Sequence, residues 1–160
     1  MGAALRPYAL ARGEGEAFWF LGTQAWVKAT GAQTGGALGL IENALPAGFA
    51  SPWHVHHAED EAFYVAEGEM TFRCGDQRVA AGPGTWVWGP REVPHGFRVE
   101  GPAAARLLLF ATPAGFERFV VELGEPAADW SSPPSGPPDM AKLMATAARY
   151  RVDILGPLPD

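Results

Sequence analysis

The sequence predicts an all-β fold, a sandwich or small barrel, followed by two helices. Short apolar runs rich in aromatic and β-branched residues recur as far as Thr112, and each run ends at Gly, Pro or Asp. The chain contains 20 glycines and 15 prolines, and because they lie between these runs they indicate turns rather than a disordered tract. After Thr112 the spacing of the apolar residues changes from strand-like to helical.

Ten short segments carry the strand pattern, with tight hairpin turns expected at Glu67-Gly68 and Gly75-Asp76. The expected strands are residues 17–21, 25–30, 36–45, 52–57, 61–68, 69–74, 77–81, 84–90, 95–100 and 105–112. Strands this short and this closely spaced fold back on one another repeatedly, which is typical of sandwiches and small barrels.

Two helices are expected after the strands. The first ends at Gly124 and carries Phe116, Phe119, Val120 and Leu123 at helical spacing. Asp139 is placed to cap the second, whose expected apolar face consists of Met140, Leu143, Met144 and Ala147. About 45 residues cannot bury much core alone. We therefore expect a single domain over residues 1–160, with a barrel at about 17–112 and a helical extension at 113–160.

Composition and charge exclude several classes of partner. The chain of 160 residues has a net charge of −6 and no basic run, so we expect neither nucleic acid nor an anionic membrane as a partner. No stretch approaches the roughly 20 apolar residues of a membrane-spanning helix, and the N-terminus has no apolar run of signal-peptide length. Cys74 is the only cysteine, which excludes an internal disulfide and fits a reducing compartment. We expect a cytoplasmic protein that acts on a small molecule.

Histidines concentrate around residues 54–57, where the chain reads HVHH. In an extended strand His54 and His56 point to the same side, and a turn would bring Glu61 back beside them. His95 is a fourth candidate ligand on a later strand. Three imidazoles and a carboxylate suit Fe, Mn, Ni, Co, Cu or Zn better than Ca or Mg. Surface histidines in a polar turn explain the His-x-His pair equally well.

The spacing of these residues resembles the two sequence motifs of the cupin superfamily. The first motif comprises Gly48, His54, His56, Glu61 and Gly68, and the second comprises Gly84, Pro90, Glu92 and His95. The chain departs from the family pattern at Glu92, where glycine is usual, and at Val99, where asparagine is common. The resemblance covers about residues 36–112 and implies a jelly-roll (double-stranded β-helix) barrel with one divalent transition metal.

Residue by residue, the resemblance implies that the metal ligands are His54, His56, Glu61 and His95. His57 is then the histidine left over. We expect Glu59 and Asp60 to be solvated acids in the turn between the two ligand-bearing strands.

A narrower resemblance links the chain to quercetin 2,3-dioxygenase-like cupins. It rests on residues 15–43 before the motifs and on residues 114–124 and 149–157 after them. In the flavonol-cleaving members the metal-bound carboxylate also accepts the proton of the substrate's hydroxyl group. This resemblance implies that Glu61 is both a metal ligand and a base.

Apolar residues share the side of the strands on which the ligands lie. Phe63, Val65 and Phe97 are therefore expected to line a substrate cavity, although any barrel interior contains such residues. Because few charged residues point the same way, we expect an aromatic or enolic substrate rather than a sugar phosphate. Trp86 and Trp88 face one side of their strand, which favours core packing or a homodimer.

Two classes of function follow from these observations. The first is a metal-dependent dioxygenase-type enzyme that acts on a small, flavonol-like molecule. The second is a metal-containing small-molecule-binding protein or sensor without catalytic activity.

Overall fold

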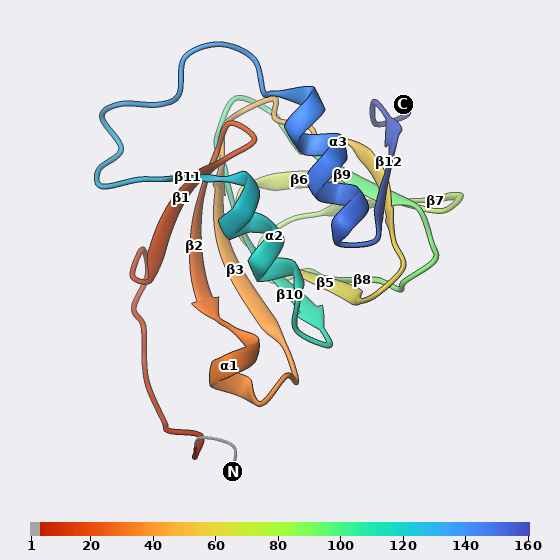
Figure 1. The fold of residues 1–160 in the computed structure, drawn as a ribbon. Helices are drawn as coiled ribbons and strands as arrows, with labels where there is room; N and C mark the ends of the chain where they lie inside the picture. Colours follow the sequence, from red (N-terminus) through yellow and green to blue (C-terminus); the bar gives the residue numbers. More distant parts are fainter. Residues whose placement is uncertain (1–3) are drawn as a thin grey trace.

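Two antiparallel β-sheets face each other in the computed structural model, which describes residues 4–160 (Figure 1). In spatial order the seven-stranded sheet contains β11 (Glu125–Pro126), β1 (Glu16–Phe20), β2 (Thr23–Ala29), β3 (Gly39–Leu45), β10 (Ala105–Thr112), β5 (Asp60–Glu67) and β8 (Trp86–Gly89). The five-stranded sheet contains β12 (Val152–Gly156), β4 (Trp53–His56), β9 (His95–Glu100), β6 (Glu69–Cys74) and β7 (Gln77–Ala81). This arrangement confirms the predicted all-β jelly-roll fold.

All ten predicted strands are present, with ends displaced by up to three residues. The structure adds three elements that the sequence pattern did not indicate: α1 (Gly31–Thr34), β11 and β12. The hairpin turn between β5 and β6 requires its glycine. Gly68 has φ +84°, and a Cβ there would lie 2.7 Å from the Cα of Ala105.

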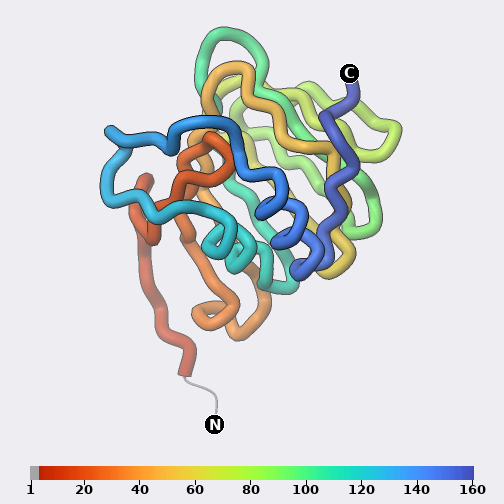
Figure 2. The backbone as a smooth tube through the Cα atoms, turned by 45° about the horizontal axis from the view of Figure 1, so that its top comes forward, coloured from red at the N-terminus to blue at the C-terminus, as the bar shows by residue number. Residues whose placement is uncertain are grey.

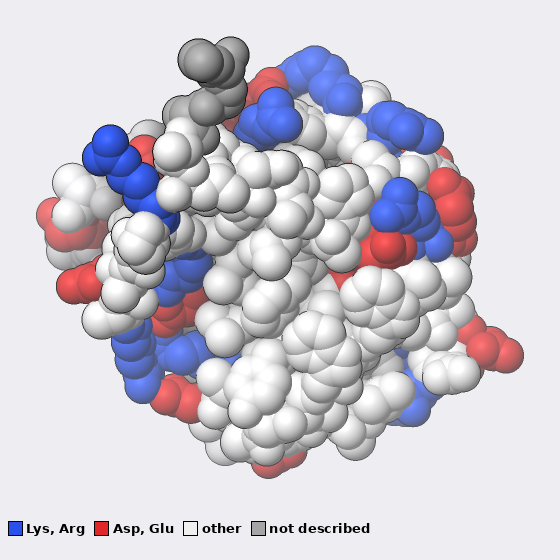
Figure 3. Space-filling view, turned by 90° about the horizontal axis from the view of Figure 1, so that it is seen from below, with Lys and Arg blue, Asp and Glu red and all other residues white. Residues whose placement is uncertain are grey.

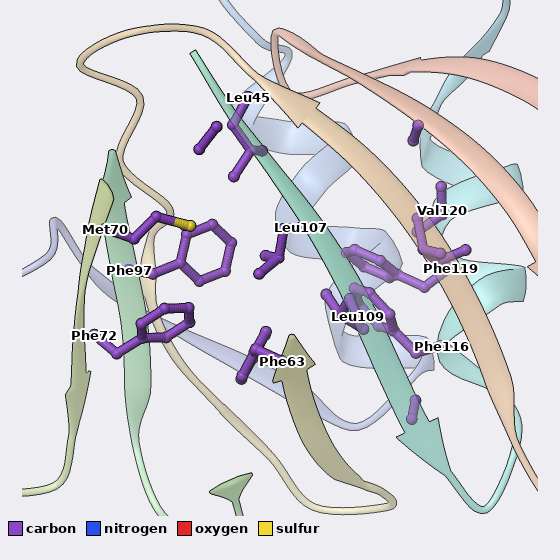
Figure 4. Close-up of a cluster of buried hydrophobic side chains, with 14 of the residues drawn as sticks. Leu45, Phe63, Met70, Phe72, Phe97, Leu107, Leu109, Phe116, Phe119 and Val120 are labelled. Atoms are coloured by element: carbon purple, nitrogen blue, oxygen red, sulfur yellow. The ribbon is translucent and has the colours of Figure 1, made fainter. Parts of the chain in front are cut away.

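The inward faces of the two sheets form one apolar core. Figure 4 shows its members from β3, β5, β6, β9, β10 and the first C-terminal helix: Leu45, Phe63, Met70, Phe72, Phe97, Leu107, Leu109, Phe116, Phe119 and Val120. Leu107 on the central strand β10 is fully buried between β3 and β5. This packing holds the strands in register and so fixes which side chains point inward.

Two helices lie side by side between the sheets, α2 (Phe116–Leu123) and α3 (Met140–Arg149) (Figures 1 and 2). The apolar face predicted for α2 is buried, and Asp139 caps α3 by accepting a hydrogen bond from the backbone N–H of Lys142 (2.9 Å). Within the described part of the chain, no helix combines the length and apolar character needed to cross a membrane.

The face predicted for α3 was partly wrong. Leu143 and Ala147 are buried, together with Thr146, but Met140 and Met144 are exposed. The reason is that α3 packs against β12 as well as α2. Because α3 contacts both β12 and α2, its buried face consists of Leu143, Thr146 and Ala147. Met140 and Met144 therefore face outward.

Candidate metal centre

Two adjacent strands of one sheet and one strand of the other bring the four predicted ligands together. His54 and His56 lie on β4, Glu61 lies near the start of β5, and His95 begins β9, where it pairs directly with His54. One candidate ligand atom from each side chain lies within 4.8 Å of the others, so the group could hold a metal ion. His56, Glu61 and His95 are buried, whereas His54 is partly exposed.

Hydrogen bonds fix the orientation of all three imidazoles. His54 donates from Nδ1 to the carbonyl oxygen of Pro52 (2.8 Å), and His95 donates from Nδ1 to that of Val93 (3.0 Å). A carbonyl oxygen can only accept, so the proton of each neutral ring must be on Nδ1. His56 Nδ1 lies 3.1 Å from the Oε1 atom of Glu59, which is also an acceptor when ionised. In its neutral form each ring is thereby left with a lone pair on Nε2 that points toward the common centre.

The imidazole Nε2 atoms surround one carboxylate oxygen, an arrangement that favours a proton or a cation at the centre. The distances from Glu61 Oε2 to Nε2 are 2.6 Å for His95, 3.1 Å for His56 and 3.8 Å for His54. Lone pairs facing a carboxylate repel it unless a proton or a cation lies between them. Among residues 4–160, the buried atoms His56 Nε2 and Glu61 Oε1 have no hydrogen-bond partner. Such atoms cost about 1–3 kcal/mol each, and a bound cation would satisfy both.

The pKa values of the buried groups also indicate that this centre favours a positive charge. Burial lowers the pKa of His56, but the charge of Glu61 and the bond to Glu59 outweigh burial and raise that pKa to about 10. Burial raises the pKa of Glu61, but the three imidazoles hold it well below its ordinary value. The pKa of His54 is lowered, chiefly by burial. A negative potential that holds a proton on His56 would hold a divalent cation in its place, and the nitrogen-rich donor set suits a transition metal.

The prediction of a solvated acid was wrong for Glu59, whereas Asp60 is partly exposed and is paired with Arg91. Glu59 is buried at 4% exposure, where it bonds to His56. Asp60 accepts hydrogen bonds from the backbone N–H and the guanidinium of Arg91 (2.9 Å each). The turn therefore folds onto the protein instead of projecting into water. The one available signal was the three-residue spacing from His56 to Glu59, which lets the carboxylate reach back to the ring.

His57 lies outside the metal cluster, as predicted. Its Nδ1 is 2.7 Å from Glu92 and its Nε2 is 3.0 Å from Asp153. Glu92 occupies the position where glycine is usual, and it adopts the left-handed conformation that glycine would allow, with φ +66°. The departure from the family pattern therefore preserves the turn, and the backbone N–H of Glu92 donates to the carbonyl of His56 (2.8 Å).

A cavity of about 70 Å³ adjoins the cluster, with His54, His56 and Glu61 in its wall. Most of the remaining wall is apolar and comes from both sheets and from α2 and α3; it includes Phe20, Leu45, Phe49, Phe97, Leu109, Phe116, Phe119, Val120 and Leu143. Of the three residues expected to line it, Phe97 does so. Phe63 and Val65 have no exposed surface and belong to the core beneath.

Comparison with known proteins agrees with this geometry. Residues 41–111 match the family described as the cupin domain. Over 120 residues, 75% of this chain, the sequence is 28% identical to a Bacillus subtilis protein named quercetin 2,3-dioxygenase. The aligned region corresponds to only 35% of that protein, so this chain spans about one third of its relative's length.

Two solved structures share the fold at low identity. An RmlC-like cupin from Shewanella frigidimarina superposes with a TM-score of 0.57 at 18% identity, over 70% of this chain and 96% of the other. A predicted oxalate decarboxylase from Thermotoga maritima superposes with a TM-score of 0.53 at 20% identity, over 57% and 80% of the two chains. These likenesses support the fold and carry no information about the reaction.

Proposed function

We propose that this protein of the cupin superfamily is a divalent-metal-dependent dioxygenase-type enzyme with a small aromatic or enolic substrate. The observation that carries the proposal is a three-histidine, one-glutamate cluster that opens onto an apolar cavity. His54, His56, Glu61 and His95 would hold the ion. When bound, a divalent transition metal supplies Lewis-acid and dioxygen chemistry at this centre.

Glu61 is the proposed base. Its low pKa keeps it ionised at neutral pH, and its Oε1 atom has no partner among the described residues. A carboxylate with a low pKa is a weak base, so it can take a proton only from a hydroxyl group whose own pKa is lowered in the site. An enolic hydroxyl group bound beside a divalent cation meets that condition. The apolar wall excludes water from the ionised substrate.

The cavity also favours an uncharged substrate over a sugar phosphate. Of the described residues that line it, none is Lys or Arg, so a phosphate group would find no positive partner. The name of the Bacillus subtilis relative supports a flavonol-like molecule.

The volume of the cavity restricts which substrates can enter. A cavity of 70 Å³ is smaller than the cavity of about 150 Å³ that accepts benzene in an engineered protein, so a flavonol enters only if the wall moves. The part of the wall that we propose to move is α2 and α3, because side-chain packing rather than strand pairing holds these helices and the segment 127–138 between β11 and α3 contains no helix or strand.

Oxygen uptake tests the proposal. Protein loaded separately with Fe, Mn, Ni or Co would be incubated with a flavonol and, as a matched control, with the flavone that lacks the enolic hydroxyl group. We expect uptake with the flavonol alone, and none in the Glu61→Gln variant. If the flavonol binds saturably but no metal supports oxygen uptake, the proposed enzyme activity is overturned. The alternative, a non-catalytic binding protein or sensor, would then be favoured.

We also propose that the protein forms a homodimer. Tyr64 on β5 and Trp86 and Trp88 on the edge strand β8 are exposed on the outer side of the barrel. These strands lie on the lower side of Figure 1, and the view from below shows a broad face with few charged side chains (Figure 3). Sedimentation of wild type and of the Trp86→Ser, Trp88→Ser double variant would test this, with a dimer expected only for wild type.

A further inference from the structure

An amide side chain lies in the middle of the apolar cavity wall. Asn43 is on β3, on the same side of the strand as the core residues Ile41 and Leu45. Its neighbours across the sheet are Ala25 on β2 and Leu107 on β10, both with no exposed surface. Asn43 itself is 6% exposed and lines the cavity. A central strand position between two apolar neighbours ordinarily carries an apolar residue.

This amide lacks a partner within the protein. In the described part of the chain, the side chain of Asn43 makes no hydrogen bond, although it is a donor and an acceptor, and its amide atoms keep some accessible surface. The other uncharged polar side chains of the wall are satisfied. Thr23 donates to the carbonyl of Phe20 (2.6 Å), and Ser51 donates to that of Pro52 (3.1 Å) and accepts from the backbone N–H of Phe97 (3.0 Å). Asn43 is thus the wall's one free uncharged polar group among residues 4–160.

The strand register places Asn43 away from the metal cluster. Glu61 on β5 is level with Ala111 on β10 and, through it, with Gly39 on β3. Asn43 lies four residues further along β3. That separation corresponds to about 13 Å along the strands and about 10 Å across two strand spacings. A single substrate oxygen cannot touch both places, but both line one cavity, so the two ends of one molecule can.

We propose that Asn43 binds a second polar group of the cavity's ligand, remote from the oxygen held at the metal cluster. This inference rests on the proposed function, since it takes the metal cluster as the site of the ligand's other end. An amide can donate to and accept from a hydroxyl or carbonyl group, and a ligand without such a group leaves the amide buried and unpaired. The favoured substrate class is therefore an extended aromatic molecule with polar groups at both ends, rather than a compact single enol.

A matched pair of ligands tests this selectivity. The probes are 3-hydroxyflavone, which carries only the enolic end, and quercetin, which carries further hydroxyl groups. Both would be titrated into protein loaded with Zn, so that binding is measured without redox turnover. In the Asn43→Leu variant, which keeps the size of the side chain, we expect affinity for quercetin to fall about tenfold. Affinity for 3-hydroxyflavone should change by less than about twofold.

Two further measurements separate a binding role from a structural one. Without ligand, Asn43→Leu should melt at or above the wild-type temperature, because the substitution removes no hydrogen bond within the protein. The control Thr23→Val removes a wall hydroxyl group that is already satisfied, so it should lower the melting temperature and leave the ratio of the two affinities unchanged.

Several results would overturn the role of Asn43. They are an equal loss of affinity for both ligands, no loss for either, a lower melting temperature of Asn43→Leu, or a wild-type protein that binds neither probe. A lack of oxygen uptake would remove the proposed enzyme activity but leave the binding selectivity intact, so the two failures are distinguishable.

Discussion

The metal cluster and the cavity wall are two adjoining regions that are built in different ways. The cluster stands on β4, β5 and β9, and each imidazole is anchored through its Nδ1 atom. Part of the wall comes from α2 and α3, which are held by side-chain packing. Strand pairing positions the candidate ligand atoms, whereas the proposed substrate would require the helices that line part of the cavity to shift. On this proposal the protein combines a centre fixed by strand pairing with an enclosure that adjusts to the ligand.

The largest effect should come from removing one of the candidate metal-binding side chains. In His54→Ala we expect metal content near background and loss of the stabilisation that metal gives, about 4 kcal/mol when the free ion is at a thousand times its dissociation constant. Metal analysis and melting curves with and without added ion would measure both.

His57→Ala is the matched control. It removes a neighbouring imidazole whose partners, Glu92 and Asp153, lie outside the cluster. It should retain metal, and full metal occupancy in His54→Ala would contradict the ligand set.

How far the sequence predicts the structure depends on whether a pattern is local. Strand alternation placed His54 and His56 on one side of β4, and the motif spacing singled out Glu61 and His95. His54 and His56 point the same way because a strand's two-residue period determines the direction of each side chain, whereas Glu61 and His95 were placed beside them by the family resemblance. The helix of residues 116–123 was predicted for the same reason, since its apolar stripe is complete within the segment.

The failures arise where distant segments decide the outcome. β12 pairs with β4, about a hundred residues away, so its five residues showed no partner in the sequence. Glu59 was expected in water because acids in turns are usually solvated, and only the folded turn brings it to His56. The face of α3 is set by contact with β12, which was itself missed. Asn43 drew no attention because its cavity exists only after both sheets and both helices are in place.

The second prediction distinguishes the role of the cavity wall from the role of the metal cluster. Leu143 on α3 is buried and lines the cavity, so Leu143→Ala should cost about 2–5 kcal/mol of unfolding free energy. The four candidate metal ligands lie on other elements, so we expect metal content to stay unchanged while binding of the small molecule weakens. Denaturant titration and metal analysis would check this.

Val121→Ala, an exposed position on α2, is the control and should change stability by less than about 0.5 kcal/mol. Loss of metal in Leu143→Ala would show that the two regions are coupled.

The third prediction concerns pH. Without metal, the pKa of His56 in the folded protein is about 10, above its ordinary 6.5, so the bound proton stabilises the fold fully below pH 6.5 and this stabilisation is lost as pH rises toward 10. Metal binding requires the neutral ring and must displace that proton. We therefore expect metal affinity to rise with pH, by up to about tenfold per pH unit, until the pH reaches about 10, while the stability of the metal-free protein falls between pH 6.5 and 10. Chelator competition and melting curves across this range would measure both trends. A metal affinity independent of pH would mean that His56 carries no proton before metal binds.

The smallest effect should come from changing Glu59, which orients the candidate metal ligand His56. Glu59 contacts His56 and no other ligand, so Glu59→Gln should weaken metal binding about tenfold through a less well held ring. Asp60→Asn changes the adjacent acid, which bonds to Arg91, and should leave metal affinity unchanged. Chelator competition at one pH compares the variants directly. If Glu59→Gln binds metal as wild type does, the orientation of His56 is set instead by packing against Phe116, whose ring centroid lies 5.2 Å away. Because Phe116 belongs to α2, the centre would then depend on the movable wall, and the contrast between the two regions would no longer hold.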